Sequence, residues 1–385
     1  MMESDQIQVN HEVLAWARES LALTRAYASE KTGISDHRLL QLENGERRPT
    51  VEELKILSKA YKRTIATLLL SRPPKEKPLP KDRRTVDSKH LGHFHFKTIM
   101  AFRKARALAS SYLELKQELS IEIPRVTFSA SLNDDPRAIA KQIRQEFKLA
   151  EVQKTVKDDH NLALEAFIEK VESLGIAVFQ LSLADEDNLR GFSILDEVFP
   201  IIGMKRGGEQ ATAKNFTLFH ELGHVLLRDE GACDLGESSG AQVEKWCNAF
   251  AAGVLIPTDE LLRMPIVISQ KKNNEKEWRQ SDLVRIGGYF HVGPLAILRS
   301  LLENGLTSSD FYKEKHLLWN KPSFVHSKNP KGRDRPMETL KEKGRTYVSL
   351  AFTAFDQNRI NMKDLSDYLG IKLTYIPKTR QLLSA

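Results

Sequence analysis

Residues 216–226 read FTLFHELGHVL, and this short stretch decides what kind of protein the sequence encodes. On an α-helix His220 and His224 lie one turn apart on the same face, so both imidazoles can reach one metal ion. Glu221 lies beside that face, where its carboxylate can act as the general base that activates water. The apolar residues around the histidines would bury the rest of the helix. The stretch therefore predicts the zinc-binding helix of a hydrolase.

A hydrolytic zinc site needs a third protein ligand and keeps a fourth position open. We expect the third ligand to be Glu244, near the start of the next helical run, residues 243–257. The connecting residues 228–240 are rich in Gly, Ser and acidic side chains, and they are long enough to return the second helix antiparallel to the first. Asn248, one turn after Glu244, is expected to hold that carboxylate. The sequence thus predicts one Zn²⁺ per chain.

Other residues of this region can also bind zinc: Cys233, Asp234, Glu237 and Cys247. Cysteine ligands are typical of structural sites, and the spacing from His224 to Cys233 matches no zinc finger. Alternatively, the His-Glu-x-x-His pattern arose by chance and the histidines bind no metal, because such strings also occur in helices without a metal site. The apolar helix followed by an acidic residue on the next helix favours zinc, although manganese or iron could occupy the same ligands.

Two segments of this region resemble a known family. Lys214 to His224, KNFTLFHELGH, together with Glu244 to Pro257, ExxxNxFAAxxxxP, resembles the ImmA/IrrE family of zinc metallopeptidases. The resemblance runs in order through most of residues 1–300. It implies an α+β, mostly helical protein with a zincin-like peptidase domain, in which the three ligands and the base named above have those roles.

The resemblance also implies a substrate class. It predicts a zinc-dependent metallo-endopeptidase that cuts a specific protein partner, a repressor or an antitoxin, in a stress or mobile-element response. Two other functions stay open: the toxin of a toxin–antitoxin pair, and a DNA-binding transcription regulator whose zinc domain only senses. Gly203 stands where an Asn is common in the family, and Lys214-Asn215 replaces a usual pair of arginines. These departures concern the substrate rather than the metal chemistry.

The N-terminal residues 8–72 read as five short helices. The second and third are joined by the turn Thr32-Gly33-Ile34, and Ser35 is a suitable N-cap for the third. The stretch from Gly33 to Thr50 resembles Xre-type repressor domains, which implies a helix-turn-helix domain. Such domains commonly precede this type of peptidase.

The third helix of this domain and the residues that follow it carry the candidate DNA contacts. Arg38 and Gln41 could read base edges, and Arg47 and Arg48 could pair with phosphates. Acidic side chains such as Asp36 oppose a close approach to DNA. The alternative is a helix-turn-helix domain that docks onto a protein.

Composition limits the class of protein. The chain has 385 residues, enough for two or three domains, and its 41% hydrophobic and 28% charged residues are typical of globular proteins. No apolar run could span a membrane and the N-terminus has no signal-peptide order, so we expect a cytoplasmic protein without membrane contact. Two cysteines agree with a reducing compartment. The net charge of +7 is spread along the chain, so it permits contact with nucleic acid without requiring it.

The remaining chain divides into three predicted regions: a proline- and charge-rich linker over 73–96, the peptidase domain over 97–305 and a helical C-terminal region over 306–385. We expect a small sheet from strands at 176–181, 191–195 and 198–204. The predicted helices are 97–119, 136–149, 161–174, 259–262, 281–290, 294–304, 338–356 and 361–369. Residues 320–336 are predicted to be a mobile basic connection. Tyr289 or His291 could assist an oxyanion, with a structural role as the alternative.

Overall fold

The computed structural model describes residues 6–80, 94–124, 126–157, 159–195, 199–228, 237–319 and 334–384, with only the backbone described at 237–241. By its internal contacts the chain divides into two compact units. They are Met1–Arg103 with Leu183–Asn188, and Lys104–Ser182 with Leu189–Ala385. Within the described ranges no helix is both long and apolar enough to cross a membrane.

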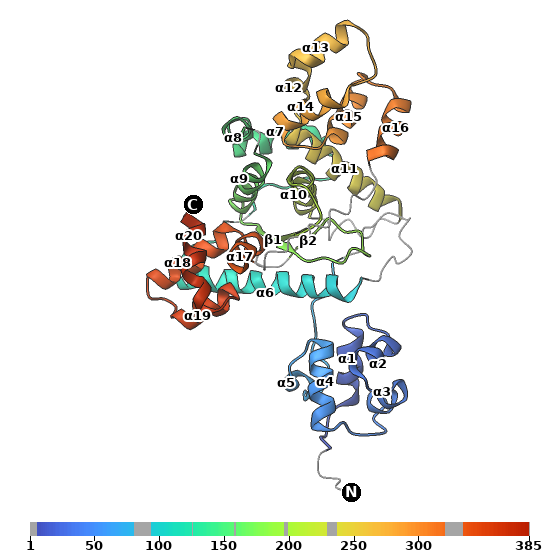
Figure 1. Cartoon of the computed structure of the whole chain (residues 1–385), viewed down its shortest axis with the longest axis vertical. Helices are drawn as coiled ribbons and strands as arrows, with labels where there is room; N and C mark the ends of the chain where they lie inside the picture. The colour runs from blue at the N-terminus through green and yellow to red at the C-terminus, as the bar shows by residue number, and fades with distance from the viewer. Residues whose placement is uncertain are drawn as a thin grey trace. The chain divides into compact units, whose positions relative to one another are not determined.

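The first unit begins with the five predicted helices, which the structure confirms. They are α1 (His11–Glu19), α2 (Arg25–Thr32), α3 (Asp36–Glu43), α4 (Val51–Tyr61) and α5 (Ile65–Leu68), drawn in blue in Figure 1. Gly33 ends α2 with φ +72°, a left-handed conformation that side chains with a Cβ rarely adopt, and Ser35 caps α3 by accepting from the Arg38 N–H. This turn therefore determines the direction in which the chain enters α3.

Ion pairs hold the third helix on its neighbours. Arg18 of α1 donates to the Glu43 carboxylate through Nε and Nη2, at 2.7 and 2.8 Å, and both side chains are nearly buried. Thr50 and Glu53 cap the start of α4 reciprocally, each side chain receiving the other's backbone N–H. Because these bonds are bidentate or reciprocal, they restrict the helix orientation more than single surface pairs do.

The rest of the first unit surrounds the start of α6 (Phe96–Glu118). The Asp187 carboxylate accepts from the His95 N–H at 3.1 Å, and the Thr98 hydroxyl accepts from the Ala184 N–H at 3.1 Å. Lys31 of α2 lies 4.3 Å above the ring of Phe96, a cation–π contact. The loop 183–188 therefore caps α6 from a distant part of the sequence.

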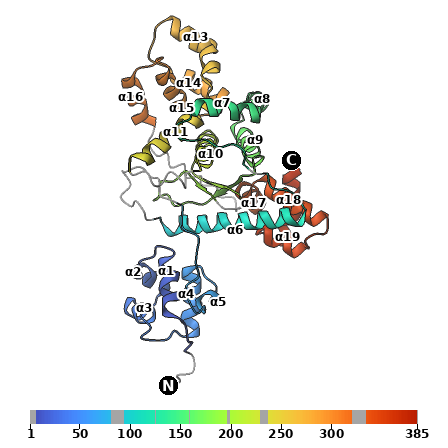
Figure 2. The ribbon, with the colours of Figure 1, turned by 180° about the vertical axis from the view of Figure 1, so that it is seen from behind.

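The second unit is organised on a three-stranded sheet. The predicted strands are confirmed as β1 (Ala177–Leu181), β2 (Gly191–Ile194) and β3 (Ile201–Lys205), in the order β1-β3-β2. β1 runs parallel to β3, and β2 runs antiparallel to it. α10 (Ala211–Leu226) covers one face of the sheet and α6 the other, as Figures 1 and 2 show from opposite sides. α17 (Arg335–Lys343) packs along β1, and β2 contacts α10. Among the described strands, β2 pairs with β3 alone.

The glycine at position 203 has a packing role in this sheet. Gly203 pairs with Phe192 across β3 and β2, and a Cβ at Gly203 would lie only 2.1 Å from the Phe192 ring. The ring fills the space that a side chain at 203 would need, an arrangement by which aromatic residues stabilise strand glycines. A side chain at position 203, such as an Asn, would therefore clash with the Phe192 ring.

Further helices build the rest of the second unit. They are α7 (Pro136–Phe147), α8 (Leu149–Val156), α9 (His160–Glu172), α11 (Glu237–Leu255), α12 (Thr258–Arg263), α13 (Pro265–Lys272), α14 (Gln280–Phe290), α15 (Pro294–Glu303) and α16 (Ser309–Trp319). Among them, α9 and α11 pack directly against α10. The sequence did not indicate α8, α13 or α16. α7 and α8 are separate because Lys148 adopts φ +51°, which breaks the helix between them.

Four helices and a short turn form the C-terminal end: α17, α18 (Arg345–Asp356), α19 (Met362–Leu369), the 3₁₀ turn Leu373–Tyr375 and α20 (Ile376–Ser384). The prediction of one helix over 338–356 was wrong. Gly344 takes φ +83° between α17 and α18, so the chain turns there. The connection predicted over 320–336 falls outside the described residues, except for 334–336.

The carboxylate of Glu172, at the end of α9, gives the fold a dependence on pH. It accepts a hydrogen bond from the Thr346 hydroxyl of α18, and burial raises its pKa to about 7. A carboxyl whose folded pKa exceeds the unfolded value binds more protons when folded, so stability falls as pH rises from about 4.5 to about 7.

We expect Glu172→Gln to remove that fall, because the amide stays neutral and still accepts from Thr346. The variant should be more stable than the wild type by about 1–3 kcal/mol at pH 8, with no such gain at pH 4. Urea titrations at both pH values measure this, with the exposed Glu146→Gln as the control, because Glu146 does not contribute to the shift of the Glu172 pKa. An equal gain at pH 4 and pH 8 would contradict the assignment.

Candidate metal centre

The two helices that carry the candidate ligands approach each other closely at Gly223. A Cβ at Gly223 of α10 would lie 3.1 Å from the Cys247 Sγ and 3.3 Å from the Cys247 Cα of α11. The missing side chain therefore lets α11 lie almost against the α10 backbone. The helices are antiparallel, as expected, because His220 contacts Asn248 while His224 contacts Glu244.

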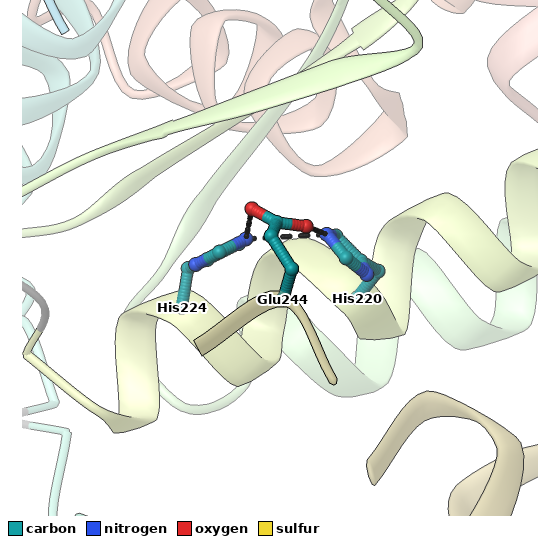
Figure 3. Close-up of side chains that lie close together, drawn as sticks. All are labelled: His220, His224 and Glu244. Atoms are coloured by element: carbon teal, nitrogen blue, oxygen red, sulfur yellow. Dashed lines mark hydrogen bonds and ion pairs between the residues drawn. The ribbon is translucent and has the colours of Figure 1, made fainter. Parts of the chain in front are cut away.

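This packing brings His220, His224 and Glu244 together. Their ligand atoms all lie within 4.8 Å of one another, and no other group of this kind occurs among the residues with described side chains. The Nε2 atoms of the histidines are 3.1 Å apart, and the Glu244 carboxylate lies 3.2 Å from His220 and 3.4 Å from His224. Figure 3 shows the carboxylate of α11 facing both imidazoles of α10.

These distances fit a tetrahedral zinc site. Bonds of about 2.0–2.1 Å in a tetrahedron place neighbouring ligand atoms about 3.3–3.4 Å apart. The two Nε2 atoms are 3.1 Å apart, and each lies near that distance from a different oxygen of the Glu244 carboxylate, 3.2 Å for His220 to Oε2 and 3.4 Å for His224 to Oε1. Two imidazole nitrogens this near to each other also need a proton or a cation between them. The set of two imidazole nitrogens and one carboxylate is therefore suited to a divalent metal.

Electrostatics in the cluster favour a cation in the same place. Burial acts to raise the pKa of the Glu244 carboxyl, but hydrogen bonds with His220 and His224 outweigh it and hold that pKa well below its usual range. The carboxylate is thus ionised over the whole physiological pH range. A negative ligand that stays ionised binds a metal without competition from protons.

Asn248 contacts a histidine rather than the carboxylate that the sequence suggested. Its Oδ1 lies 3.0 Å from the His220 Nδ1. An amide oxygen only accepts, so the Nδ1–H of His220 donates and the Nε2 lone pair points toward His224 and Glu244. Asn248 thereby sets the tautomer and the ring orientation of His220.

Glu221 lies outside the three clustered groups but beside them on α10. It is only 7% exposed, and its side chain faces Gly191, the first residue of β2. A carboxylate that neighbours the ligands without joining them is available for proton transfer. The base role of Glu221 remains a prediction that this placement supports.

Of the alternative ligands, Cys247 alone has a described side chain. Cys233, Asp234 and the Glu237 side chain lie outside the described residues. Cys247 is buried against Gly223, and burial raises the pKa of its thiol, which disfavours the thiolate that binds metals.

The two residues suggested for the oxyanion lie at the end of α14. His291 is fully buried, with its Nδ1 3.0 Å from the His160 Nδ1, whereas Tyr289 is 40% exposed. The His291 ring is therefore held between helices, and the oxyanion role of either residue stays a prediction.

Comparison with known families agrees with this geometry. Residues 171–301 match the model of the IrrE N-terminal-like domain, Peptidase_M78, and residues 14–68 match a helix-turn-helix model. The chain carries an ImmA/IrrE-type metallopeptidase domain preceded by an Xre-type helix-turn-helix domain. No curated protein and no solved structure matches the chain. The matched peptidase segment contains all three strands, α10 and α11, and with them every candidate metal ligand.

In the Xre-type domain, Arg38 is paired within the protein. Its guanidinium donates to both oxygens of Glu53, at 2.8 and 2.9 Å, and to the Arg48 carbonyl at 3.0 Å. Arg47 and Arg48 are exposed, and the Gln41 side chain is half-buried. No signal in the sequence pointed to the Arg38–Glu53 pair, although the spacing from Thr50 to Glu53 is that of a capping box and gives Glu53 a local role. Base reading by Arg38 remains a prediction, and it requires Arg38 to leave Glu53.

Asn248 provides a test of the metal centre of the ImmA/IrrE-type domain. Asn248→Ala removes the acceptor that orients His220, and we expect zinc affinity to fall about 10- to 100-fold. Asn248→Asp keeps an acceptor for the Nδ1–H and should bind zinc nearly as well as the wild type. Competition with a chelating dye measures both affinities. Unchanged affinity in Asn248→Ala would show that His220 is oriented by something else or is not a ligand.

Proposed function

We propose that the chain is a zinc-dependent metallo-endopeptidase. The observation that carries the proposal is the cluster of His220, His224 and Glu244, with Glu221 next to the first histidine on the same helix. The three clustered residues would hold the ion, one per chain. The IrrE N-terminal-like match supports peptide hydrolysis as the reaction.

A zinc ion at these ligands would supply Lewis acidity: it would polarise a carbonyl oxygen and lower the pKa of water so that a base can deprotonate it at neutral pH. Glu221 would accept the proton from the attacking water and later deliver it to the leaving amine. Its low exposure limits competing proton exchange with bulk solvent. Asn248 accepts from the His220 Nδ1–H, so Nε2 is the nitrogen of this ring that faces the other two ligands and can bind the ion.

The edge of the sheet offers a place for the substrate backbone. Among the described strands β2 pairs only with β3, so its other edge can accept an extended peptide through backbone hydrogen bonds. β2 begins at Gly191, in contact with Glu221, and a peptide along this strand would pass the base. α17 packs along β1 at the opposite edge of the sheet. This asymmetry favours β2 as the substrate strand.

The substrate that we propose is a specific protein, a repressor or an antitoxin, cut in a stress or mobile-element response in the cytoplasm. The Xre-type domain on the same chain supports a regulatory role, because it can bring the peptidase near proteins that are bound to DNA. The toxin of a toxin–antitoxin pair is the alternative. Expression without the neighbouring genes separates the two, since a toxin arrests growth and a repressor-specific peptidase does not.

The metal and base assignments are tested together with Glu244→Ala and Glu221→Gln. The wild type should hold about one zinc, Glu244→Ala should lose it, and Glu221→Gln should keep it. In a lysate of the source organism, mass spectrometry of protein N-termini should find new ends with the wild type and none with Glu221→Gln. The new ends identify the substrate.

Each outcome points to one part of the proposal. Zinc retained by Glu244→Ala would make the third ligand wrong and return Asp234, Glu237 or a cysteine to consideration. New N-termini produced equally by Glu221→Gln would remove Glu221 as the base. A wild type that holds zinc but produces no new N-termini would favour the second candidate, a transcription regulator with a sensing zinc domain.

DNA binding by the Xre-type domain is a proposal of its own, favoured by the exposure of Arg47 and Arg48 after α3. We expect the double variant Arg47→Ala/Arg48→Ala to weaken binding to duplex DNA and to reduce the salt slope by about 2, because each lost phosphate contact removes about 0.9. Arg38→Ala should instead lower thermal stability, since it leaves Glu53 without its partner. Fluorescence anisotropy at several salt concentrations measures the DNA affinity and its salt slope, and thermal melts measure the stability of each variant.

An unchanged salt slope in the double variant would show that these arginines do not contact phosphates. A change in base preference on Arg38→Ala without loss of stability would restore Arg38 as a base-reading residue.

A further inference from the structure

One face of α10 lies directly against the first residue of β2. A Cβ at Gly191 would lie 2.7 Å from the Thr217 Cγ2, 3.1 Å from the Glu221 Cγ and 3.1 Å from the Glu221 Oε1. Thr217 and Glu221 are one turn apart on α10, and both are nearly buried. The strand backbone at Gly191 is therefore the surface on which the Glu221 side chain rests.

Glycine is needed at this position for space and not for backbone conformation. Gly191 does not have a positive φ, so an alanine could adopt its backbone angles without strain. The added methyl would instead meet Thr217 at a distance that real Cβ contacts do not show, and it would press on Glu221 at two atoms. Either Glu221 or the strand would have to move.

We propose that Gly191 is a positioning residue that fixes the Glu221 carboxylate beside the metal ligands. The inference rests on the proposed role of Glu221 as the base, and it adds that the sheet edge sets where this base stands. By this inference β2 has two tasks: it offers the substrate edge, and through its missing side chain it places the group that transfers the proton. A base moved by about 1 Å can lose about 100-fold in rate.

The two contacts of Gly191 can be separated by mutation. Thr217→Ser removes the Cγ2 methyl, which is the closest contact, and keeps the hydroxyl that donates to the Ala213 carbonyl at 3.2 Å. The double variant Gly191→Ala/Thr217→Ser therefore relieves the general packing conflict but keeps the methyl against Glu221. It also provides a variant that should fold even where Gly191→Ala alone does not.

A matched control is available in the loop after β3. Gly207 also lacks a positive φ, and a Cβ there meets nothing within 4 Å. Gly207→Ala thus makes the same chemical change without any contact. It should leave the structure, zinc affinity and rate unchanged.

The experiment compares crystal structures, zinc affinities, melting temperatures and cleavage rates of the four proteins: wild type, Gly191→Ala, Gly191→Ala/Thr217→Ser and Gly207→Ala. The rate is measured on the protein whose new N-terminus the wild type produces. In both Gly191→Ala variants we expect the Glu221 carboxylate to be displaced by about 1 Å and the rate to fall about 10- to 100-fold, with zinc affinity unchanged. Thr217→Ser should restore the melting temperature but not the rate.

Two results would overturn the inference: a Glu221 carboxylate that keeps its position in the double variant, or a rate that returns to the wild-type value when Thr217 is shortened. Failure of the proposed function appears differently. If the wild type cuts no protein in the lysate, the base role is lost, and the position of Glu221 in the crystal structures still decides whether Gly191 places that side chain.

Discussion

The close contact between α10 and α11 at Gly223 and Cys247 is the constraint on which the metal centre depends. The candidate ligands come from two helices, of which α10 ends at Leu226 and α11 begins at Glu237. The side chain of Glu244 is short compared with the usual distance between packed helices. A Cβ at Gly223 would already lie 3.1 Å from Cys247, so any side chain there would push α11 outward. The separations of 3.1–3.4 Å among the ligand atoms exist because that side chain is absent.

Glycines also allow close packing where α10 meets the sheet. Gly191 leaves room for Glu221, and Gly203 leaves room for the Phe192 ring on the other side of β2 and β3. In our proposal the sheet therefore places the carboxylate of Glu221, whereas α11 brings the carboxylate of Glu244 to the two histidines of α10. Because the two supports are separate, a change in one can alter proton transfer while the other keeps the metal in place.

The Xre-type domain relies on ion pairs rather than on close backbone contacts. Arg18 holds the end of α3 through Glu43, and Arg38 holds its start through Glu53 of α4. Both pairs are largely shielded from solvent, and breaking either would leave a carboxylate without its partner. Arginines that serve the fold in this way are not free for DNA, which leaves the exposed Arg47 and Arg48 as the cationic groups of the following turn.

The sequence by itself determined the local features of this protein. Helix caps, turn glycines and hydrophobic periodicity located the five N-terminal helices, the three strands and α10, since these signals lie within a few residues of one another. It also put His220 and His224 on one helix face, because helix geometry alone sets that relation. Only the tertiary structure decided that Glu244 reaches both histidines, that Asn248 holds His220 rather than Glu244, and that Arg38 pairs with Glu53. Those contacts join residues on different elements, and they depend on how closely two backbones approach, which no spacing along the chain encodes.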